Sequence, residues 1–332
     1  MRLVLDAEQR AFTASLEALL TGADTPSVVR EWSRGEHGSG RALWGRLAAA
    51  GVFALAAPEE YDGVGVRPVE LALAFLALGR HVVPGPLVET VAAAVLLPAP
   101  DLVKRLVSGE TLATVAYDGP YALDGAADLR PVPTPDGPYA LDGDAADLRL
   151  VLTPDGLYAA AGRGPVRPSL DPARRLTTLA PGDLLTAEPP LAKALLLARL
   201  ATAAQALGVG LALLDRTVAY VGQRTQFGTP VGSFQAVKHQ LADVKTALEF
   251  ARPLVLAAAV TLDPADVAAA KVTAGEAAYA TARTALQLHG AIGYTAEYNL
   301  SLWLTKARAL RTAWGSPQEC RDTVLSAGGR RS

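Results

Sequence analysis

The sequence predicts a mainly α-helical protein with a small β region. We expect an N-terminal helical domain (1–110), a reduced middle β-domain (111–189) and a C-terminal four-helix bundle (190–332). Apolar residues recur at helical spacing in the first and last parts, whereas the middle part alternates strand-like pieces with Pro, Gly and Asp. With 332 residues, of which 50% are hydrophobic and 19% charged, the chain can also bury a large core.

Three amphipathic segments predict helices in the N-terminal part. LDAEQRAFTASLEALL (5–20) places its large apolar residues near one face, and GRALWGRLAAAGVFAL (40–55) follows the same pattern until turn signals end it. PVELALAFLALGR (68–80) has Pro68 near its start and Gly79 near its end, which are typical helix boundaries.

The middle part contains two strand-like pieces and an imperfect tandem repeat. TLATVAY (111–117) and LRLVLT (148–153) have strand composition, and GPYALDGAADLR (119–130) recurs as GPYALDGDAADLR (137–149). A repeat present only twice is too short for a solenoid. We interpret it as a local duplication in a small β region of two or three hairpins, without a function of its own.

Long helices are predicted again towards the C-terminus. Residues 191–220 are apolar almost all round, as in a helix buried inside a bundle, and another helix runs from Asp263-Pro264 to about His289. Between them, apolar residues step by 3, 4, 3 and 4, which predicts a bundle seam of Phe234, Val237, Leu241, Val244 and Leu248.

Composition excludes several kinds of protein. A formal net charge of −2 without a long basic run argues against electrostatic binding of nucleic acid or a membrane surface. The single cysteine, Cys320, excludes an internal disulfide framework, and the four histidines have no compact metal-ligand spacing. Charges at Asp6, Glu8 and Arg10 occupy the place of a signal peptide's apolar stretch, so we expect a cytoplasmic protein.

Two segments carry candidate binding residues. Arg224-Thr225-Gln226-Phe227-Gly228 links two long helices. Its Arg suits a phosphate and Gly228 permits close backbone approach, although composition alone favours a plain turn with a solvated Arg. Gln287 and Gly290 lie at the end of a later helix, where a ligand could be approached. A helix stop also explains Gly290, and His289 reads as a helix-end residue rather than a base.

Taken together, RTQFGTPVGSFQAVKHQLADV (224–244) and ALQLHGAIGYTAEY (285–298) closely resemble the C-terminal bundle of the acyl-CoA dehydrogenase family. Residues 43–91, from LWGRL to VETV, resemble the family's N-terminal helical domain. The resemblance is weakest between about 115 and 187. It implies the three-part fold described above and oxidation of acyl-CoA thioesters at Cα–Cβ, with FAD as hydride acceptor and an electron-transfer flavoprotein as electron acceptor.

In this family FAD lies across a protomer interface, and one protomer supplies contacts to its neighbour's cofactor. Carried over by resemblance, Arg224, Gln226 and Phe227 contact the pyrophosphate and adenine, with Gln287 and Gly290 nearby. Ala291 replaces the family's usual second glycine, which is a mild departure.

The family's catalytic glutamate is missing. Its usual position falls on Trp314, and an alternative position, before a retained arginine that matches Arg199, falls on Ala198. An indole cannot act as a base. Three nearby acidic residues read as ordinary helix charges rather than substitute bases: Glu297, Glu319 and Asp322.

The middle part also lacks a T-E-P-x-x-G-S-D-like segment, which binds the flavin ring in relatives, and is shorter than the family's β-domain. With GRHVVPGPLVETV (79–91) and SLDPARRL (169–176), the chain also resembles the short, non-catalytic subunits of actinobacterial α2β2 acyl-CoA dehydrogenases. That resemblance implies a full-length paralogue as partner, one FAD per heterodimer, and a CoA thioester substrate, in several cases of a steroid side chain.

Two other hypotheses remain open from the sequence. Trp314 at the base position is also compatible with a homo-oligomeric protein of this fold without redox activity, such as a scaffold or a biosynthetic cyclase or dehydratase. The third hypothesis is a self-sufficient dehydrogenase whose base is an unrecognised Asp or Glu.

Overall fold

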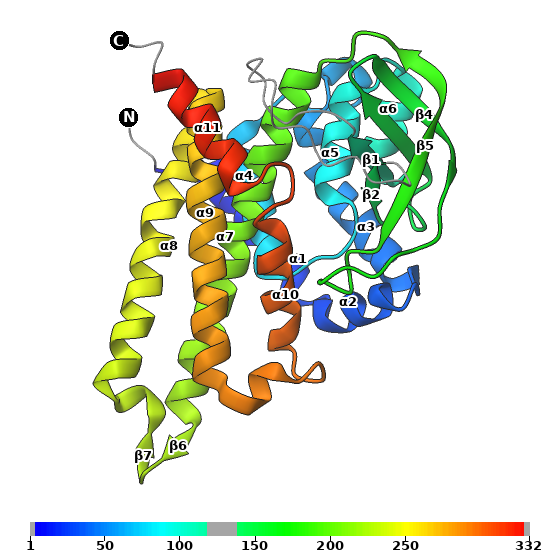
Figure 1. The fold of residues 1–332 in the computed structure, drawn as a ribbon. Coiled ribbons are helices and arrows are strands. Elements are labelled where there is room, and N and C mark those ends of the chain that lie inside the picture. The colour runs from blue at the N-terminus through cyan, green and yellow to red at the C-terminus, as the bar shows by residue number, and fades with distance from the viewer. Residues whose placement is uncertain (1–3, 118–137, 329–332) are drawn as a thin grey trace.

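The computed structural model describes residues 4–117 and 138–328. The chain forms a helical bundle with a small curved sheet beside it, and the N-terminal helices lie behind and between the two (Figure 1). The N-terminal helices are α1 (Ala7–Thr21), α2 (Thr25–Ser33), α3 (Gly38–Ala49), α4 (Pro68–Arg80), α5 (Leu87–Leu96) and α6 (Pro100–Val107).

Local sequence signals set the boundaries of these helices. At the start of α1, the Asp6 side chain accepts from the Gln9 backbone N–H at 2.8 Å while the Gln9 side chain accepts from the Asp6 N–H at 3.1 Å, which is a capping box. Pro68 occupies the first turn of α4, as predicted, since its missing N–H costs nothing there. The three predicted amphipathic segments correspond to α1, to α3 with the short 3-10 turn after it, and to α4.

The middle part forms a five-stranded sheet in the order β1-β3-β4-β5-β2: β1 (Ala113–Tyr117), β2 (Tyr139–Leu141), β3 (Leu148–Thr153), β4 (Gly156–Arg163) and β5 (Leu176–Thr186). Successive antiparallel pairs β3–β4 and β4–β5 match the expected hairpins. β1, however, runs parallel to β3, so hairpins alone do not describe the sheet. The second copy of the repeat contributes β2 and the start of β3; the first copy lies outside the described residues.

The C-terminal part contains the longest helices: α7 (Leu191–Gln223), α8 (Gln235–Thr261) and α9 (Pro264–His289), followed by α10 (Leu300–Leu310) and α11 (Pro317–Gly328). Helix α7 is long and apolar enough to cross a membrane, but 89% of its most apolar stretch is buried inside the protein. It is therefore the central helix of the bundle, as its all-round hydrophobicity predicts. The predicted seam along α8 is buried only in its later part, at Val244 and Leu248, whereas Phe234 is 37% exposed.

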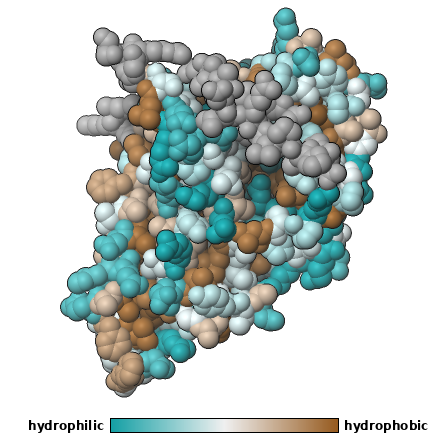
Figure 2. Space-filling view, in the orientation of Figure 1, coloured by the Kyte–Doolittle hydropathy of each residue, from teal (hydrophilic) through white to brown (hydrophobic). Residues whose placement is uncertain are grey.

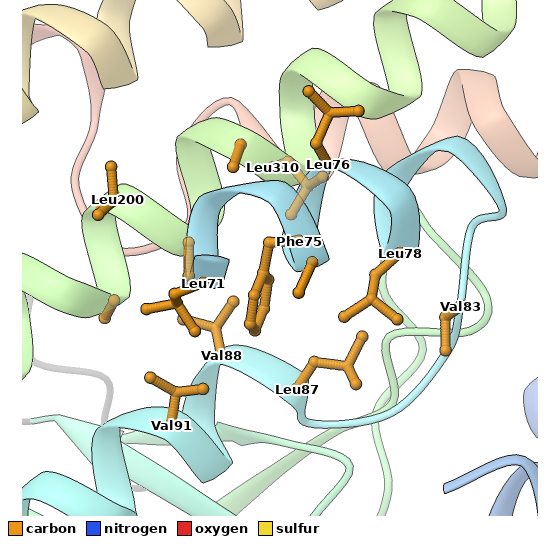
Figure 3. Packing of buried hydrophobic residues seen from close by; sticks show 14 of the residues in the cluster. Leu71, Phe75, Leu76, Leu78, Val83, Leu87, Val88, Val91, Leu200 and Leu310 are labelled. Carbon is orange, nitrogen blue, oxygen red and sulfur yellow. The ribbon is translucent and has the colours of Figure 1, made fainter. Parts of the chain in front are cut away.

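Helices α4 and α7 pack unusually closely because each helix has a glycine that faces the backbone of the other helix. A Cβ on Gly208 would lie 2.0 Å from the Leu76 carbonyl oxygen, and one on Gly79 would lie 2.1 Å from the Gln205 carbonyl oxygen. The apolar core continues from this crossing to α5, where Phe75 packs among leucine and valine side chains (Figure 3).

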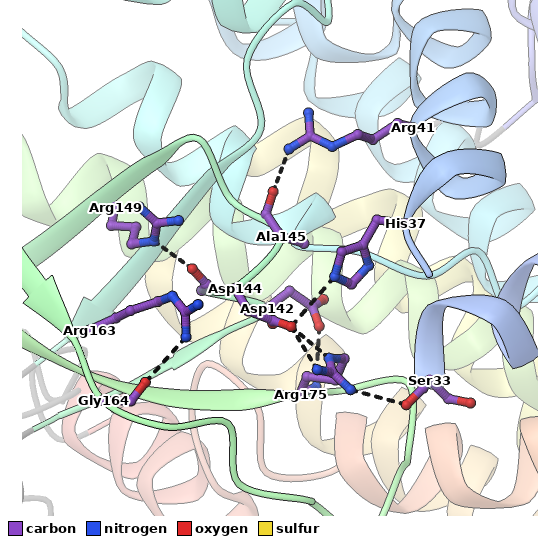
Figure 4. Close-up of polar contacts among 11 residues, drawn as sticks. Ser33, His37, Arg41, Asp142, Asp144, Ala145, Arg149, Arg163, Gly164 and Arg175 are labelled. Atoms are coloured by element: carbon purple, nitrogen blue, oxygen red, sulfur yellow. Dashed lines mark hydrogen bonds and ion pairs between the residues drawn. The ribbon is translucent and has the colours of Figure 1, made fainter. Parts of the chain in front are cut away.

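Charged side chains join the sheet to the N-terminal helices (Figure 4). Arg175 donates two hydrogen bonds to Asp144 Oδ2, at 2.9 and 2.7 Å, and one to the Ser33 carbonyl at 3.1 Å. His37 lies 3.5 Å from the same Asp144 oxygen. The neighbouring Asp142 is fully buried and accepts from the Arg175 backbone N–H at 3.2 Å. This network fixes the turn between β2 and β3 against α2 and α3.

Candidate functional site

The segment between α7 and α8 is a projecting two-stranded hairpin, β6 (Thr225–Gln226) and β7 (Thr229–Pro230), at one end of the bundle (Figure 1). Phe227 and Gly228 form its tip, with φ of 54° and 77°, the geometry of a tight hairpin turn. Phe227 is 95% exposed, although an aromatic ring is among the costliest groups to leave in water. The hairpin therefore exposes an aromatic ring at its tip, where a molecule outside the fold of this chain could contact it.

Arg224, at the base of the hairpin, is exposed and lies near the ring of Tyr220, with its guanidinium carbon 5.9 Å from the ring centroid. Gln226 is also exposed, and its side chain donates only to the Thr225 carbonyl, at 2.8 Å. Hydrophobic side chains gather at this end of the molecule (Figure 2). A guanidinium and an amide beside an exposed aromatic ring can bind a phosphate and stack on a planar base.

The predicted helix-end residues lie at the same end of the bundle. Tyr220 stacks on His289, with ring centroids 4.1 Å apart, and donates to the His289 carbonyl at 3.3 Å, so the start of the hairpin and the end of α9 are joined. Gly290 follows α9 with φ of 64°, a helix-stop conformation that favours glycine. His289 is 2% exposed and its Nδ1 contacts the Ala285 carbonyl at 2.8 Å, which confirms a packed helix-end histidine.

Gln287 is exposed and lines a pocket of about 460 Å³ on the surface of α8 and α9, with Gln240, Arg283 and Tyr294. The pocket therefore has two side-chain amides and a guanidinium, and it lies at the bundle end where Tyr294 is 74% exposed. Among the described residues, the structure thus brings the five predicted cofactor residues to one end of the bundle and leaves Arg224, Gln226, Phe227, Gln287 and Gly290 exposed.

At the other predicted position, Trp314 is buried, 7% exposed, in the loop between α10 and α11. Its indole Nε1 donates to Glu89 Oε1 of α5 at 3.1 Å, and its carbonyl accepts from Arg199 Nε at 3.2 Å. Its φ of 57° is a strained conformation for a bulky residue, which these contacts hold in place. Ala198, the second expected base position, is fully buried in α7.

A cavity of about 130 Å³ remains beside the Trp314 ring, bordered by α5, β1, β2 and the loop before α11. Its lining includes Glu89, Tyr117 and Tyr139, and burial raises the pKa of Tyr117 to about 12. Pockets for drug-sized ligands measure about 300–1,000 Å³, so this cavity by itself is smaller than such a pocket. Trp314, at the position that the resemblance assigns to the catalytic base, lines this cavity.

Buried cations clamp the loop that carries Trp314. Lys271, on α9, is 1% exposed and donates to the carbonyls of Leu310, Arg311 and Gly315 at 3.0, 3.1 and 3.3 Å. Burial lowers the pKa of Lys271 to about 8. The last carbonyls of α10 therefore receive side-chain donors, and the loop has little freedom to move Trp314 out of the cavity.

The sequence reasoning missed Glu89. An acidic residue inside the apolar stretch 87–96 was the available signal, because such residues are rarely buried unless they have a partner. The acidic residues that were considered lie elsewhere: Glu319 accepts from the Ser316 backbone N–H at 2.6 Å at the start of α11, Asp322 accepts from the Gln318 side chain at 3.0 Å, and Glu297 is exposed before α10. None of these three lines the cavity beside Trp314.

Comparisons with known proteins agree with this architecture. The acyl-CoA dehydrogenase N-terminal domain family matches residues 6–99 and the acyl-CoA dehydrogenase C-terminal domain family matches residues 191–327. Acyl-CoA dehydrogenase IpdE2 of Mycolicibacterium smegmatis is 31% identical over 318 residues, which cover 94% of this chain and 96% of that protein.

Two solved structures have the same fold over nearly the whole chain. A chain of the ChsE4-ChsE5 complex from Mycobacterium tuberculosis matches with a TM-score of 0.79 and 26% identity, covering 99% of this chain and 98% of that one. A chain of a Tcur3481-Tcur3483 steroid ACAD variant matches with a TM-score of 0.77 and 27% identity, covering 98% and 99%. The chain therefore belongs to the acyl-CoA dehydrogenase family.

Proposed function

We propose that this chain is the non-catalytic subunit of a hetero-oligomeric, FAD-dependent acyl-CoA dehydrogenase. A full-length paralogue supplies the catalytic base and the cradle for the flavin ring. This chain contributes Arg224, Gln226, Phe227, Gln287 and Gly290 to the adenine and pyrophosphate half of the same FAD, in an α2β2 assembly. The observation that carries the proposal is the contrast between the exposed hairpin and the filled cavity beside Trp314.

The hairpin residues fit the polar half of FAD. Arg224 offers a guanidinium for a pyrophosphate, Gln226 and Gln287 offer amides, and Phe227 offers an exposed ring on which adenine can stack. Within the described part of the chain these groups are exposed, and the hairpin projects from the bundle (Figure 1). Their exposure supports binding in trans, where a partner subunit encloses them.

The chain's own cleft does not fit FAD chemistry. The Trp314 indole donates a hydrogen bond to the Glu89 carboxyl group at 3.1 Å, and the cavity of about 130 Å³ beside them is by itself too small for a flavin. The clamp formed by Lys271 and Arg199 on the Trp314 loop supports a permanently closed cleft. The α-proton of the substrate must therefore be removed by a carboxylate of the partner.

When bound, FAD supplies the hydride acceptor for Cα–Cβ oxidation. The residues of this chain bind and orient its polar half: Arg224 neutralises pyrophosphate charge, and Phe227 covers the adenine and excludes water from it. Electrons then leave the complex to an electron-transfer flavoprotein. The two heteromeric relatives, one described as a steroid ACAD, support a paralogue partner and a CoA thioester of a steroid side chain as substrate.

Co-purification tests this function. The chain is produced alone and together with a full-length family paralogue from its own operon, and flavin absorbance and acyl-CoA dehydrogenation are measured for both. We expect flavin and activity only in the complex. Flavin and activity in the chain alone would refute the non-catalytic reading.

A second candidate function rests on the same filled cavity. Because Trp314 seals the chain's own cleft, a homo-oligomer without redox activity remains the alternative. Size measurement during the co-purification separates the two, because a stable homotetramer that ignores the paralogue and holds no flavin favours the alternative. For a self-sufficient dehydrogenase whose base is an unrecognised Asp or Glu, Glu89 is the candidate, because it is the acidic residue among the described residues that line the cavity beside Trp314. Glu89→Gln in an active chain would then abolish turnover.

A further inference from the structure

A second pocket, outside the proposed FAD contacts, lies between the loop before β5 and helices α9 and α10. Its volume is about 560 Å³ and it opens to solvent. Of the described residues that line it, three are arginines and none is acidic: Ser169, Leu170, Arg174, Leu176, Tyr279, Arg308, Ala309, Arg311, Thr312 and Ala313. Three positive charges in one pocket repel each other unless an anion enters.

The protein neutralises these arginines poorly. Arg308 donates to the Tyr279 hydroxyl at 3.2 Å, which is an uncharged partner. Arg311 has only a long contact of 3.9 Å with Glu276, whose carboxylate is already bound by Arg321 at 2.5 Å. The Nε of Arg311 is buried and has no hydrogen-bond partner in the part of the chain that the structure describes.

Arg174 adds a third guanidinium from the opposite wall. It is half-buried, and no hydrogen bond or ion pair of its side chain is formed with any described residue. The Tyr279 ring forms the floor between the other two, with the guanidinium carbons of Arg308 and Arg311 at 6.0 and 5.2 Å from its centroid. The guanidinium groups of Arg308 and Arg311 can therefore contact the Tyr279 ring while their N–H groups remain free to donate hydrogen bonds to a ligand.

We infer that this pocket, defined by Arg174, Arg308 and Arg311 around Tyr279, binds a small dianionic ligand, a phosphate ester or a dicarboxylate. Guanidinium groups bind both oxyanions through paired N–H donors, and a volume of about 560 Å³ accommodates a small metabolite. The pocket shares Arg174, Leu176, Thr312 and Ala313 with the cavity beside Trp314. The site goes beyond the proposed function, because its residues lie apart from the hairpin to which that proposal assigns FAD binding.

Calorimetric titration of the full chain at fixed ionic strength tests the inference, with inorganic phosphate and succinate as separate probes. We expect one of them to bind at one site per chain, which identifies the oxyanion. Arg308→Gln and Arg174→Gln should each weaken that binding about tenfold. Arg321→Gln, which removes a neighbouring cation outside the pocket, and Arg224→Ala, which removes the hairpin cation, should leave it unchanged.

Circular dichroism of each variant checks that the fold is retained. If Arg174→Gln does not fold, Arg308→Gln alone tests the loss of anion binding. Absence of binding by both probes overturns the inference. It is equally overturned if all variants bind as the unmodified chain does, or if only Arg224→Ala loses binding. Because Arg308→Gln should keep the flavin of the hetero-oligomer while Arg224→Ala loses it, failure of this inference and failure of the proposed function are distinguishable.

Discussion

The indole Nε1 of Trp314 donates a hydrogen bond to Glu89 Oε1 across 3.1 Å, and the two residues are separated by 225 positions in the chain. Both are buried, at 7% and 5% exposure. Trp314 lies in the loop to which the family resemblance assigns the catalytic glutamate. Glu89 lies in α5, one of the N-terminal helices. The pair therefore links the loop before α11 to helix α5.

Removing the indole donor should destabilise the protein. Trp314→Phe keeps an aromatic ring but leaves a buried carboxyl group unsatisfied, which costs about 1–3 kcal/mol of unfolding free energy. Urea unfolding measures the loss. Adding Glu89→Leu to Trp314→Phe should recover part of it, because both polar partners are then absent; strictly additive losses would show that the pair is not coupled.

Asp142 should make the protein less stable as the pH rises. Burial raises the pKa of this carboxyl group to about 7 from an ordinary value near 3.8, so the folded state keeps a proton that the unfolded state releases. Stability is then full below about pH 4 and is lost as the pH rises to about 7, at roughly 1.4 kcal/mol per unit. Asp142→Asn cannot ionise and should be more stable than the parent at pH 8 but similar at pH 4.

Asp144 provides the control for this measurement with the opposite sign. The guanidinium of Arg175 outweighs burial and lowers the pKa of Asp144, so its contribution is present at neutral pH and is lost as the pH falls through the lowered value. Asp144→Asn should therefore destabilise the protein at pH 8. Equal effects of the two substitutions at pH 8 would contradict the assignment.

The close crossing of α4 and α7 should not tolerate a methyl group. Gly208→Ala places a Cβ 2.0 Å from a backbone carbonyl, which cannot move aside as a side chain can, and we expect a loss of about 1–3 kcal/mol. Gly222→Ala, in the same helix, meets no atom within 4 Å and should be neutral or stabilising by about 0.5–1 kcal/mol. Similar melting temperatures for the two variants would refute the close packing.

Phe227 should matter to the assembly and not to the fold of the chain. Phe227→Asn removes a ring that is 95% exposed, and asparagine tolerates the φ of 54° at this position. The unfolding free energy of the chain should therefore change by less than about 0.5 kcal/mol. Flavin retention by the hetero-oligomer should fall, measured by absorbance after gel filtration. Leu325→Asn, which replaces a 73% exposed residue on α11, should retain flavin; matching losses would point to a general surface effect.

Helix positions were predictable because their signals are local. Pro68, the Asp6 cap and the apolar spacing of residues 68–80 act within a few residues and define α1 and α4 without reference to the rest of the chain. The α7 core helix was predictable for the same reason, since its apolar surface has to be covered on every side.

Long-range relationships were not predictable in this way. The parallel pairing of β1 with β3 joins Ala113 to Leu148, and no turn signal between them specifies it. The hairpin residues could be named from the sequence because they are contiguous, but their exposure could not. Glu89 was visible as a charge in an apolar helix, yet its partner became apparent only when the fold brought Trp314 beside it.

The most direct test of the trans arrangement is the FAD content of the co-purified hetero-oligomer when this chain carries Arg224→Ala. Arg34→Ala is the matched control. Arg34 is exposed at the end of α2, far from the hairpin, and among the described residues its ion pair is with Glu36. We expect one FAD per heterodimer in the parent and in Arg34→Ala, and loss of FAD from an otherwise intact Arg224→Ala complex. Full retention of FAD by the Arg224→Ala complex would contradict the assignment of the hairpin to the partner's cofactor.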